Sequence, residues 1–110
     1  MSERRYVVRP KADCDLDEQA YYYATVANPE LGHRFLLAAH DTFALLATQP
    51  NMGWHPRLRH PGLETMRVLT GKGSEKILVL YLPVPDGAEI LRLIHGSRNL
   101  EALLRREGLE

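Results

Sequence analysis

The sequence predicts a single α+β domain over residues 1–110, in which a helical hairpin packs on a small, mainly antiparallel sheet in the order β-α-α-β-β-β-α. Its 110 residues are the size of one domain with one core. Apolar residues recur at three- and four-residue spacing between residues 11 and 49, which is the period of a helix. Between residues 64 and 95, short apolar runs alternate with Gly-containing turns, which is the pattern of antiparallel strands.

The first half of the chain is predicted to form one strand and two helices. Residues 4–9 are β-branched or aromatic at their centre and end at a proline, which suits a first strand. The helix predicted over residues 11–27 starts with acidic residues, which the helix dipole favours, and ends before Asn28. Pro29 opens a second helix that extends to Gln49, so the two helices form a hairpin.

The second half is predicted to form three strands and a short helix after an irregular loop. The loop and the strands are expected at residues 51–62, 64–69, 76–82 and 88–95. The strand at 76–82 is apolar at nearly every position, so we expect it to be central in the sheet or buried on both faces. The short C-terminal helix is predicted to begin at a capping residue, Ser97 or Asn99.

The charges balance, with 14 Lys and Arg against 14 Asp and Glu. A neutral chain argues against a protein that holds nucleic acid by bulk attraction. One stretch, residues 53–76, is basic, and we interpret it either as solvated loop charge or as a surface for a polyanion or an acidic partner. Its ionisable residues are Arg57, Arg59, Arg67, Lys72 and Lys76 against Glu64 and Glu75, with His55 and His60.

We expect no metal, no cofactor and no membrane contact. The single cysteine, Cys14, lies between two Asp and cannot form an internal disulfide, which predicts an inert thiol in a reducing cytoplasm. The five His show no zinc-type spacing, and Gly71-Lys-Gly73-Ser lacks the length of a P-loop. The N-terminus has no apolar leader and the longest apolar run is too short to span a membrane, so the expected location is the cytoplasm.

Arginine and tyrosine side chains fall within the predicted strands. Two-residue alternation puts Arg92 on one face with Ile90 and Ile94, where the guanidinium needs either a carboxylate partner or a ligand. Arg67 and Tyr81, in the two preceding strands, raise the same question.

The tetrapeptide His95-Gly96-Ser97-Arg98 brings an imidazole, a hydroxyl and a guanidinium to the junction of the last strand and the last helix. Cleavage of RNA by its own 2′-hydroxyl needs a general base, a general acid and a cation, which His, Tyr and Arg supply. In the structural alternative, His95 bonds a backbone carbonyl, Ser97 caps the helix, and Arg98 pairs with Glu18 or Glu101.

The first helix carries three consecutive tyrosines, Tyr21, Tyr22 and Tyr23. Consecutive residues point in different directions around a helix, so we expect one ring in the core and the others over a groove or a partner. Tyr21 and Tyr22, with Arg34 of the second helix, form a candidate surface for an amphipathic helix or strand of a partner.

Several motifs occur in the order known for one family. Residues 90–100 read Ile-Leu-Arg-Leu-Ile-His-Gly-Ser-Arg-Asn-Leu, close to the family motif Arg-Val-Leu-His-Gly-Ala-Arg-Asp, from which Leu93-Ile94, Ser97 and Asn99 depart conservatively. Shorter matches are Asp15, Leu16 and Tyr22, then Arg34-Phe35 with Ala38, then Leu45, Leu46, Ala47 and Pro50, then Gly53, Met66-Arg67 and Leu80-Tyr81. On these residues the chain resembles the RelE/ParE toxin superfamily, on the ParE branch, over residues 4–106.

The resemblance implies a toxin of a type II toxin-antitoxin pair, of the kind associated with plasmid stabilization. ParE-like toxins poison DNA gyrase, whereas relatives of similar fold cleave mRNA on the ribosome. The implied antitoxin is a small, DNA-binding, ParD-like protein whose C-terminal tail folds along the toxin, and the complex represses its own operon. Direct DNA binding by the toxin without its antitoxin is not expected.

Of the two activities that the resemblance implies, the apolar central strand and the neutral charge favour gyrase inhibition without catalytic residues over RNA cleavage. The residues expected to contact the target are Arg59, Arg67, Arg92, His95 and Arg98, and those expected to contact the antitoxin are Tyr21, Tyr22 and Arg34. One alternative is a ribosome-dependent mRNA endonuclease that uses His95 or Tyr81 with Arg67 and Arg92. Another is a non-toxic remnant that only binds its antitoxin.

Overall fold

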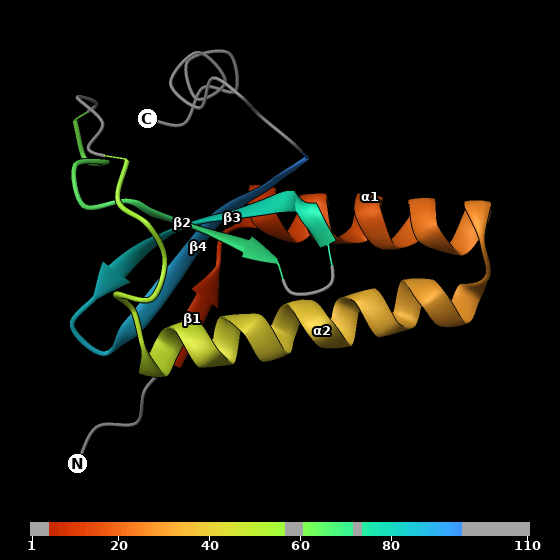
Figure 1. Cartoon of the computed structure of the whole chain (residues 1–110), viewed down its shortest axis with the longest axis horizontal. Helices are drawn as coiled ribbons and strands as arrows, with labels where there is room; N and C mark the ends of the chain where they lie inside the picture. The colour runs from red at the N-terminus through yellow and green to blue at the C-terminus, as the bar shows by residue number, and fades with distance from the viewer. Residues whose placement is uncertain (1–4, 57–60, 72–73, 96–110) are drawn as a thin grey trace.

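The computed structural model describes residues 5–56, 61–71 and 74–95, which form two helices and one sheet (Figure 1). In chain order the elements are β1 (Arg5–Val8), α1 (Pro10–Val26), α2 (Pro29–Thr48), β2 (Arg67–Gly71), β3 (Ser74–Val84) and β4 (Gly87–His95). The predicted α+β class and the order β-α-α-β-β-β are confirmed. The predicted C-terminal helix from Ser97 or Asn99 lies outside the described residues.

β3 and β4 lie at the centre of the four-stranded sheet, whose order is β1-β4-β3-β2. β3 is antiparallel to both of its neighbours, whereas β1 pairs with β4 in parallel. Parallel neighbours need a long connection between them, and the helical hairpin is part of that connection. The sheet is therefore mainly antiparallel, and the strand predicted at 76–82 is central, both as expected.

A capped connection and a close helix contact hold α1 and α2 together as the predicted hairpin. The Asn28 side chain accepts a hydrogen bond from the Leu31 backbone N–H at 2.8 Å, and Pro29 stands in the first turn of α2. A Cβ on Gly32 would lie 2.6 Å from the Ala20 carbonyl oxygen. Glycine at this position is what lets the two helix backbones approach so closely.

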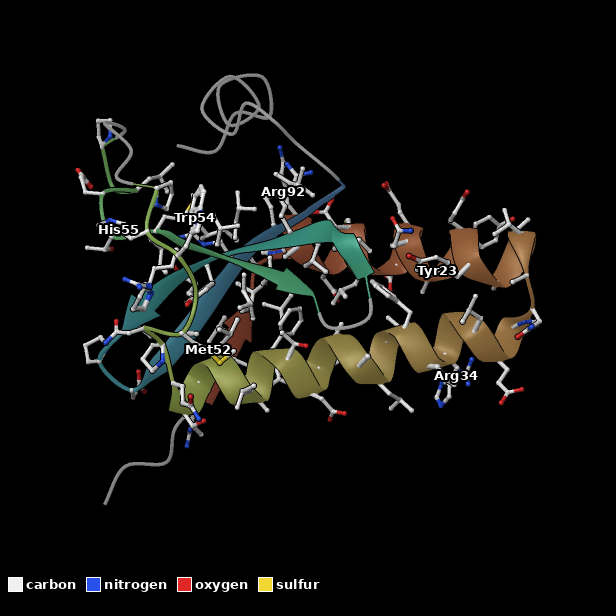
Figure 2. The ribbon with its side chains drawn as sticks, in the orientation of Figure 1. Tyr23, Arg34, Met52, Trp54, His55 and Arg92 are labelled. Atoms are coloured by element: carbon white, nitrogen blue, oxygen red, sulfur yellow. The ribbon has the colours of Figure 1, made fainter. Side chains whose placement is uncertain are left out.

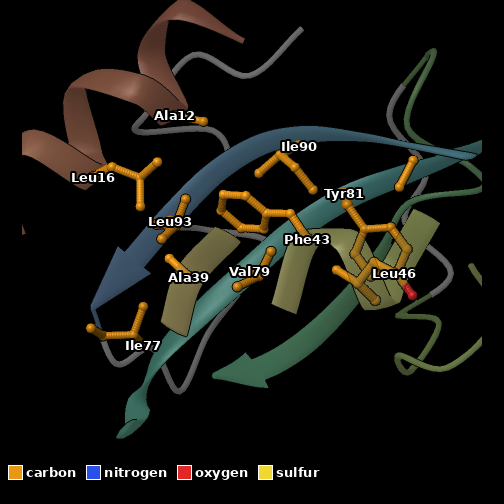
Figure 3. Close-up of a cluster of buried hydrophobic side chains, with 11 residues drawn as sticks. Ala12, Leu16, Ala39, Phe43, Leu46, Ile77, Val79, Tyr81, Ile90 and Leu93 are labelled. Carbon is orange, nitrogen blue, oxygen red and sulfur yellow. The ribbon is translucent and has the colours of Figure 1, made fainter. Parts of the chain in front are cut away.

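Two apolar clusters cover the two faces of the sheet. The cluster between the helices and the sheet, shown in Figure 3, contains Ala12, Leu16, Ala39, Phe43, Leu46, Ile77, Val79, Tyr81, Ala88, Ile90 and Leu93. The second cluster contains Leu63, Met66, Val68, Leu80, Leu91 and Ile94. Because Val79 and Tyr81 belong to the first cluster and Leu80 to the second, β3 is buried on both faces.

The prediction that Ile90, Arg92 and Ile94 share one face of the last strand is wrong. Arg92 pairs with Leu80 and Ile90 pairs with Tyr81, so Leu91 between them has no cross-strand partner and forms a bulge. Ile90 therefore packs in the helix-side cluster, whereas Ile94 packs in the other cluster. One extra residue reverses the alternation that a regular strand would keep.

The start of β2 was also mispredicted, by three residues. Residues 64 and 65 lie in a turn, in which the Met66 N–H donates to the Leu63 carbonyl at 3.1 Å, and the strand begins at Arg67. Both Leu63 and Met66 are buried in the second cluster. The turn buries apolar residues three apart, and this spacing does not by itself separate a turn from the beginning of a strand.

Candidate functional site

The Tyr81 side chain is fully buried and holds the loop that follows α2. Its hydroxyl donates to the Pro50 carbonyl at 2.7 Å and accepts from the Gly53 backbone N–H at 2.9 Å. Burial raises the pKa of Tyr81 above 10.0, against the opposing effects of the Gly53 hydrogen bond and the neighbouring Arg67 charge. The hydroxyl is therefore protonated near neutral pH, and its proton is engaged by the loop.

Arg67 binds the same loop from the adjacent strand. It is the cross-strand partner of Tyr81, so the two side chains lie on the same face of the sheet. Its Nε donates to the Gly53 carbonyl at 2.8 Å, and its Nη2 donates to the Asn51 carbonyl at 3.0 Å. The structure thus brings together two residues that sequence reasoning placed in one hypothetical catalytic set, and both bind backbone atoms of the chain itself.

Arg92 forms an ion pair with Asp15 of α1. Its Nε donates to Oδ2 at 2.7 Å and its Nη2 donates to Oδ1 at 3.0 Å, while the Leu93 backbone N–H also donates to Oδ2 at 3.0 Å. The Arg92 and Asp15 side chains are only 11% and 14% exposed. Of the two partners considered for Arg92, the structure shows the carboxylate. The pair fastens α1 to the bulged part of β4.

The hairpin displays the tyrosines as expected. Tyr23 is partly buried and its ring packs 5.3 Å from that of Phe35, whereas Tyr21 and Tyr22 are 74% and 55% exposed. Arg34 is also exposed on α2. Figure 2 shows Arg34 and Tyr23 in the half of the hairpin that extends away from the sheet. The three residues predicted to contact the antitoxin are therefore accessible.

Other predicted site residues fall where the structure describes little. Arg59 and Arg98 lie outside the described residues. The His95 backbone closes β4 opposite Ile77, and nothing beyond its backbone is described.

Within the described residues, no three His, Cys, Asp or Glu side chains are grouped as metal ligands. None of the described helices has both the length and the apolar character needed to cross a membrane.

Sequence reasoning missed two exposed apolar side chains on the loop that Tyr81 and Arg67 hold. Met52 and Trp54 are 40% and 56% exposed, on either side of the buried Gly53. The available signal was the single Trp of the chain, set among Pro and Gly in an irregular segment. What the sequence does not reveal is that hydrogen bonds from Tyr81 and Arg67 position this segment.

Comparison with known proteins assigns the family. The family model described as the ParE toxin of type II toxin-antitoxin system, parDE, matches residues 6–100. The chain is also similar to a solved structure described as a chromosomal ParDE TA system from P. aeruginosa, with 20% sequence identity, a TM-score of 0.68, and coverage of 84% of this chain and 95% of that one. A search among curated proteins gave no match. The structural likeness agrees in fold, and the family model spans most of the chain, so the chain belongs to the ParE toxin family of type II toxin-antitoxin systems.

Proposed function

We propose that this chain is a toxin that inhibits DNA gyrase by binding to it, and that a ParD-like antitoxin neutralises it. Membership of the ParE toxin family supports the toxin class. The similar structure, from a ParDE system, supports an antitoxin of the ParD type. The gyrase target comes from the resemblance to the ParE branch.

Three candidate catalytic groups are bound to other parts of the fold, and this observation favours inhibition over RNA cleavage. Tyr81 and Arg67 bind the backbone of the loop after α2, and Arg92 binds Asp15. A general base must be deprotonated near neutral pH so that it can accept a proton from the substrate. The raised pKa of Tyr81 keeps its hydroxyl protonated. A cation that stabilises a phosphorane must face the phosphate, whereas the Arg92 guanidinium is held by a carboxylate of its own chain.

The antitoxin surface that we propose is the exposed side of the hairpin at Tyr21, Tyr22 and Arg34. Exposed tyrosines combine a large apolar ring with a polar tip, which suits a protein interface. A partner helix laid along the hairpin would bury these rings without disturbing Tyr23, which already packs on Phe35.

A supercoiling assay with purified bacterial gyrase and relaxed plasmid tests the target. We expect supercoiling to fall as toxin is added, and to recover when the protein encoded by the adjacent reading frame is added as antitoxin. Heat-unfolded toxin serves as the control. Normal supercoiling together with toxin-dependent cleavage of ribosome-bound mRNA would contradict the proposal and favour the endonuclease. Normal supercoiling without any growth arrest, but with antitoxin bound, would favour the non-toxic remnant.

A further inference from the structure

The side of α2 that faces away from α1 and the sheet exposes both apolar and charged side chains. Figure 1 shows α2 along one side of the molecule, with α1 and the sheet on its other side. The exposed residues follow one another at three- and four-residue spacing, which keeps them on one face of a helix. We call them the outer face of α2: Arg34, Leu37, Ala38, Asp41 and Leu45. Leu37 and Leu45 are 54% and 43% exposed, so this face has apolar area that a partner could cover.

Arg34 and Asp41 carry the charges of the outer face, and neither has an ion-pair partner within the described part of the chain. The ion pairs between described residues both involve β4, which binds Arg9 and Asp15. Arg34 and Asp41 are seven residues apart, about 10 Å along the helix axis. Side chains on one helix pair at three- or four-residue spacing, so these two do not pair with each other. Each charge is therefore available to a group of opposite charge on another molecule.

The order of residues on the outer face is self-complementary. Arg34 lies three positions before Leu37, and Asp41 lies three positions after Ala38. A twofold axis between Leu37 and Ala38 would therefore lie about 5 Å along the helix from each charge. If two copies of α2 pack antiparallel about this axis, Arg34 of each copy meets Asp41 of the other. The Leu37 side chain of each copy then meets the small Ala38 of the other, and the same patch serves both chains.

The charges favour this antiparallel arrangement over a parallel one. Parallel packing of the same face would place Arg34 against Arg34 and Asp41 against Asp41, and like charges opposite one another oppose binding. The antiparallel pair instead forms two ion pairs and removes the exposed Leu37 from water. With an identical partner, both halves of the interface consist of described residues, and their charges and sizes match.

We propose that the outer face of α2 binds a second copy of this chain, with the two helices antiparallel and two Arg34–Asp41 ion pairs around a centre of Leu37 and Ala38. The inference goes beyond the proposed function, because it requires neither gyrase nor an antitoxin. Arg34 also belongs to the surface proposed for the antitoxin, so a second copy and the antitoxin should exclude each other at this face.

Exchange of the two charges tests the pairing. Sedimentation equilibrium of the chain without antitoxin measures association, and circular dichroism checks that each variant keeps its helices. We expect the wild type to form a dimer. Arg34→Asp leaves two acids on the outer face and Asp41→Arg leaves two bases, so each variant alone should raise the dissociation constant by about tenfold or more. An equimolar mixture of the two variants restores both ion pairs in each heterodimer and should associate about as tightly as the wild type.

Asp17→Arg is the matched control for Asp41→Arg. It makes the same change of charge at an exposed position, but on α1. It should therefore form the dimer like the wild type. A dimer weakened equally by Asp17→Arg and Asp41→Arg would show an effect of overall charge and would contradict the pairing.

Three further results would overturn the inference. One is a wild-type chain that stays monomeric up to about 500 μM. Another is equal association of the wild type and either single variant, which would place the interface elsewhere. The third is a mixture of Arg34→Asp and Asp41→Arg that fails to associate.

None of these results bears on the gyrase target, which the supercoiling assay tests by itself. The antitoxin, added to the wild-type dimer, should convert it to a complex without the α2 contact. If the antitoxin binds and the two copies still associate through Arg34 and Asp41, the α2 pairing stands and Arg34 is outside the antitoxin surface.

Discussion

At the scale of single residues, three of the polar side chains that suggested catalysis, Tyr81, Arg67 and Arg92, bind other groups of the chain itself. Tyr81 and Arg67 occupy opposite positions on β3 and β2, and their polar atoms meet the carbonyls and N–H groups of one loop. A polar group that is shielded from water is costly unless it is hydrogen-bonded. The hydroxyl of the buried Tyr81 and the guanidinium of the partly buried Arg67 both find their partners in a loop that has no regular structure of its own. The same bonds stabilise the loop.

Replacing Tyr81 with Phe tests this role. The variant leaves the Pro50 carbonyl and the Gly53 N–H without their common partner, and we expect it to lower the free energy of unfolding by about 1–3 kcal/mol. Urea denaturation measures the difference. Tyr21→Phe, at an exposed position, is the matched control and should be neutral. Equal stability of the two variants would show that the hydroxyl bridge contributes nothing.

The raised pKa of Tyr81 also predicts a dependence on pH. Since the hydroxyl ionises more readily in the unfolded chain, its contribution to stability is complete below pH about 10. It decreases as the pH rises above that value toward the higher pKa of the folded state. The stability difference between wild type and Tyr81→Phe should therefore shrink above pH about 10. A difference that is constant through alkaline pH would contradict the direction of the shift.

At the scale of elements, two contacts join segments that are distant in the sequence. Asp15 on α1 accepts from Arg92 and Leu93 at the bulge of β4, and Gly32 on α2 lies against the backbone of α1 at Ala20. The first contact ties the hairpin to the sheet, and the second ties the two helices to each other. The apolar periodicity of these helices and strands predicts neither contact, because each contact depends on a single residue.

Asp15→Asn should weaken the attachment of α1 to β4. The substitution removes the charge that faces Arg92 in a site that is mostly shielded from water, for which we expect a loss of about 2–3 kcal/mol, as for hydrogen bonds to a charged group. Asp17→Asn, on the exposed side of the same helix, is the control and should change stability by less than about 0.5 kcal/mol. Chemical denaturation of both variants distinguishes loss of the Asp15–Arg92 ion pair from a general effect of removing negative charge from α1.

Gly32→Ala tests the approach of the helices. Alanine has the higher helix propensity by about 1 kcal/mol, so in an open position it would stabilise α2. Here the added Cβ meets the Ala20 carbonyl oxygen, and overpacking of this kind costs about 1–3 kcal/mol. We expect a net decrease in melting temperature. An increase would mean that the hairpin opens without cost.

At the scale of the whole molecule, the fold places two kinds of exposed surface at different ends. The hairpin carries exposed tyrosines on α1, and the loop after α2 carries Met52 and Trp54. A toxin that must meet both an antitoxin and a target can use such a separation, since each surface is then free to match one partner.

Tyr22→Ala and Tyr23→Ala should separate partner binding from folding. Tyr22 is more than half exposed, so its truncation should weaken antitoxin binding by about tenfold while leaving the melting temperature near that of wild type. Tyr23 packs on Phe35 beside the core, so its truncation should mainly lower the melting temperature. Calorimetric titration and thermal unfolding supply the two measurements. The reverse order of effects would assign Tyr22 to the core.

The sequence by itself determined the class of the fold, the order of its described elements, the helical hairpin and the central position of β3. These properties depend on local patterns: the helical period, the Asn28-Pro29 connection, and an apolar run long enough to be buried on both faces. It also identified the family, through short motifs spread over most of the chain.

Only the tertiary structure decided what the individual side chains do. The bulge at Leu91 depends on a register that strand periodicity does not encode, and it moved Ile94 to the other face of the sheet. The partners of Tyr81 and Arg92 lie 31 and 77 residues away in the chain. A hydrogen bond across such a separation depends on where two elements meet in space. For the same reason, the sequence does not show that Tyr81 and Arg67 hold the loop that carries the exposed Trp54.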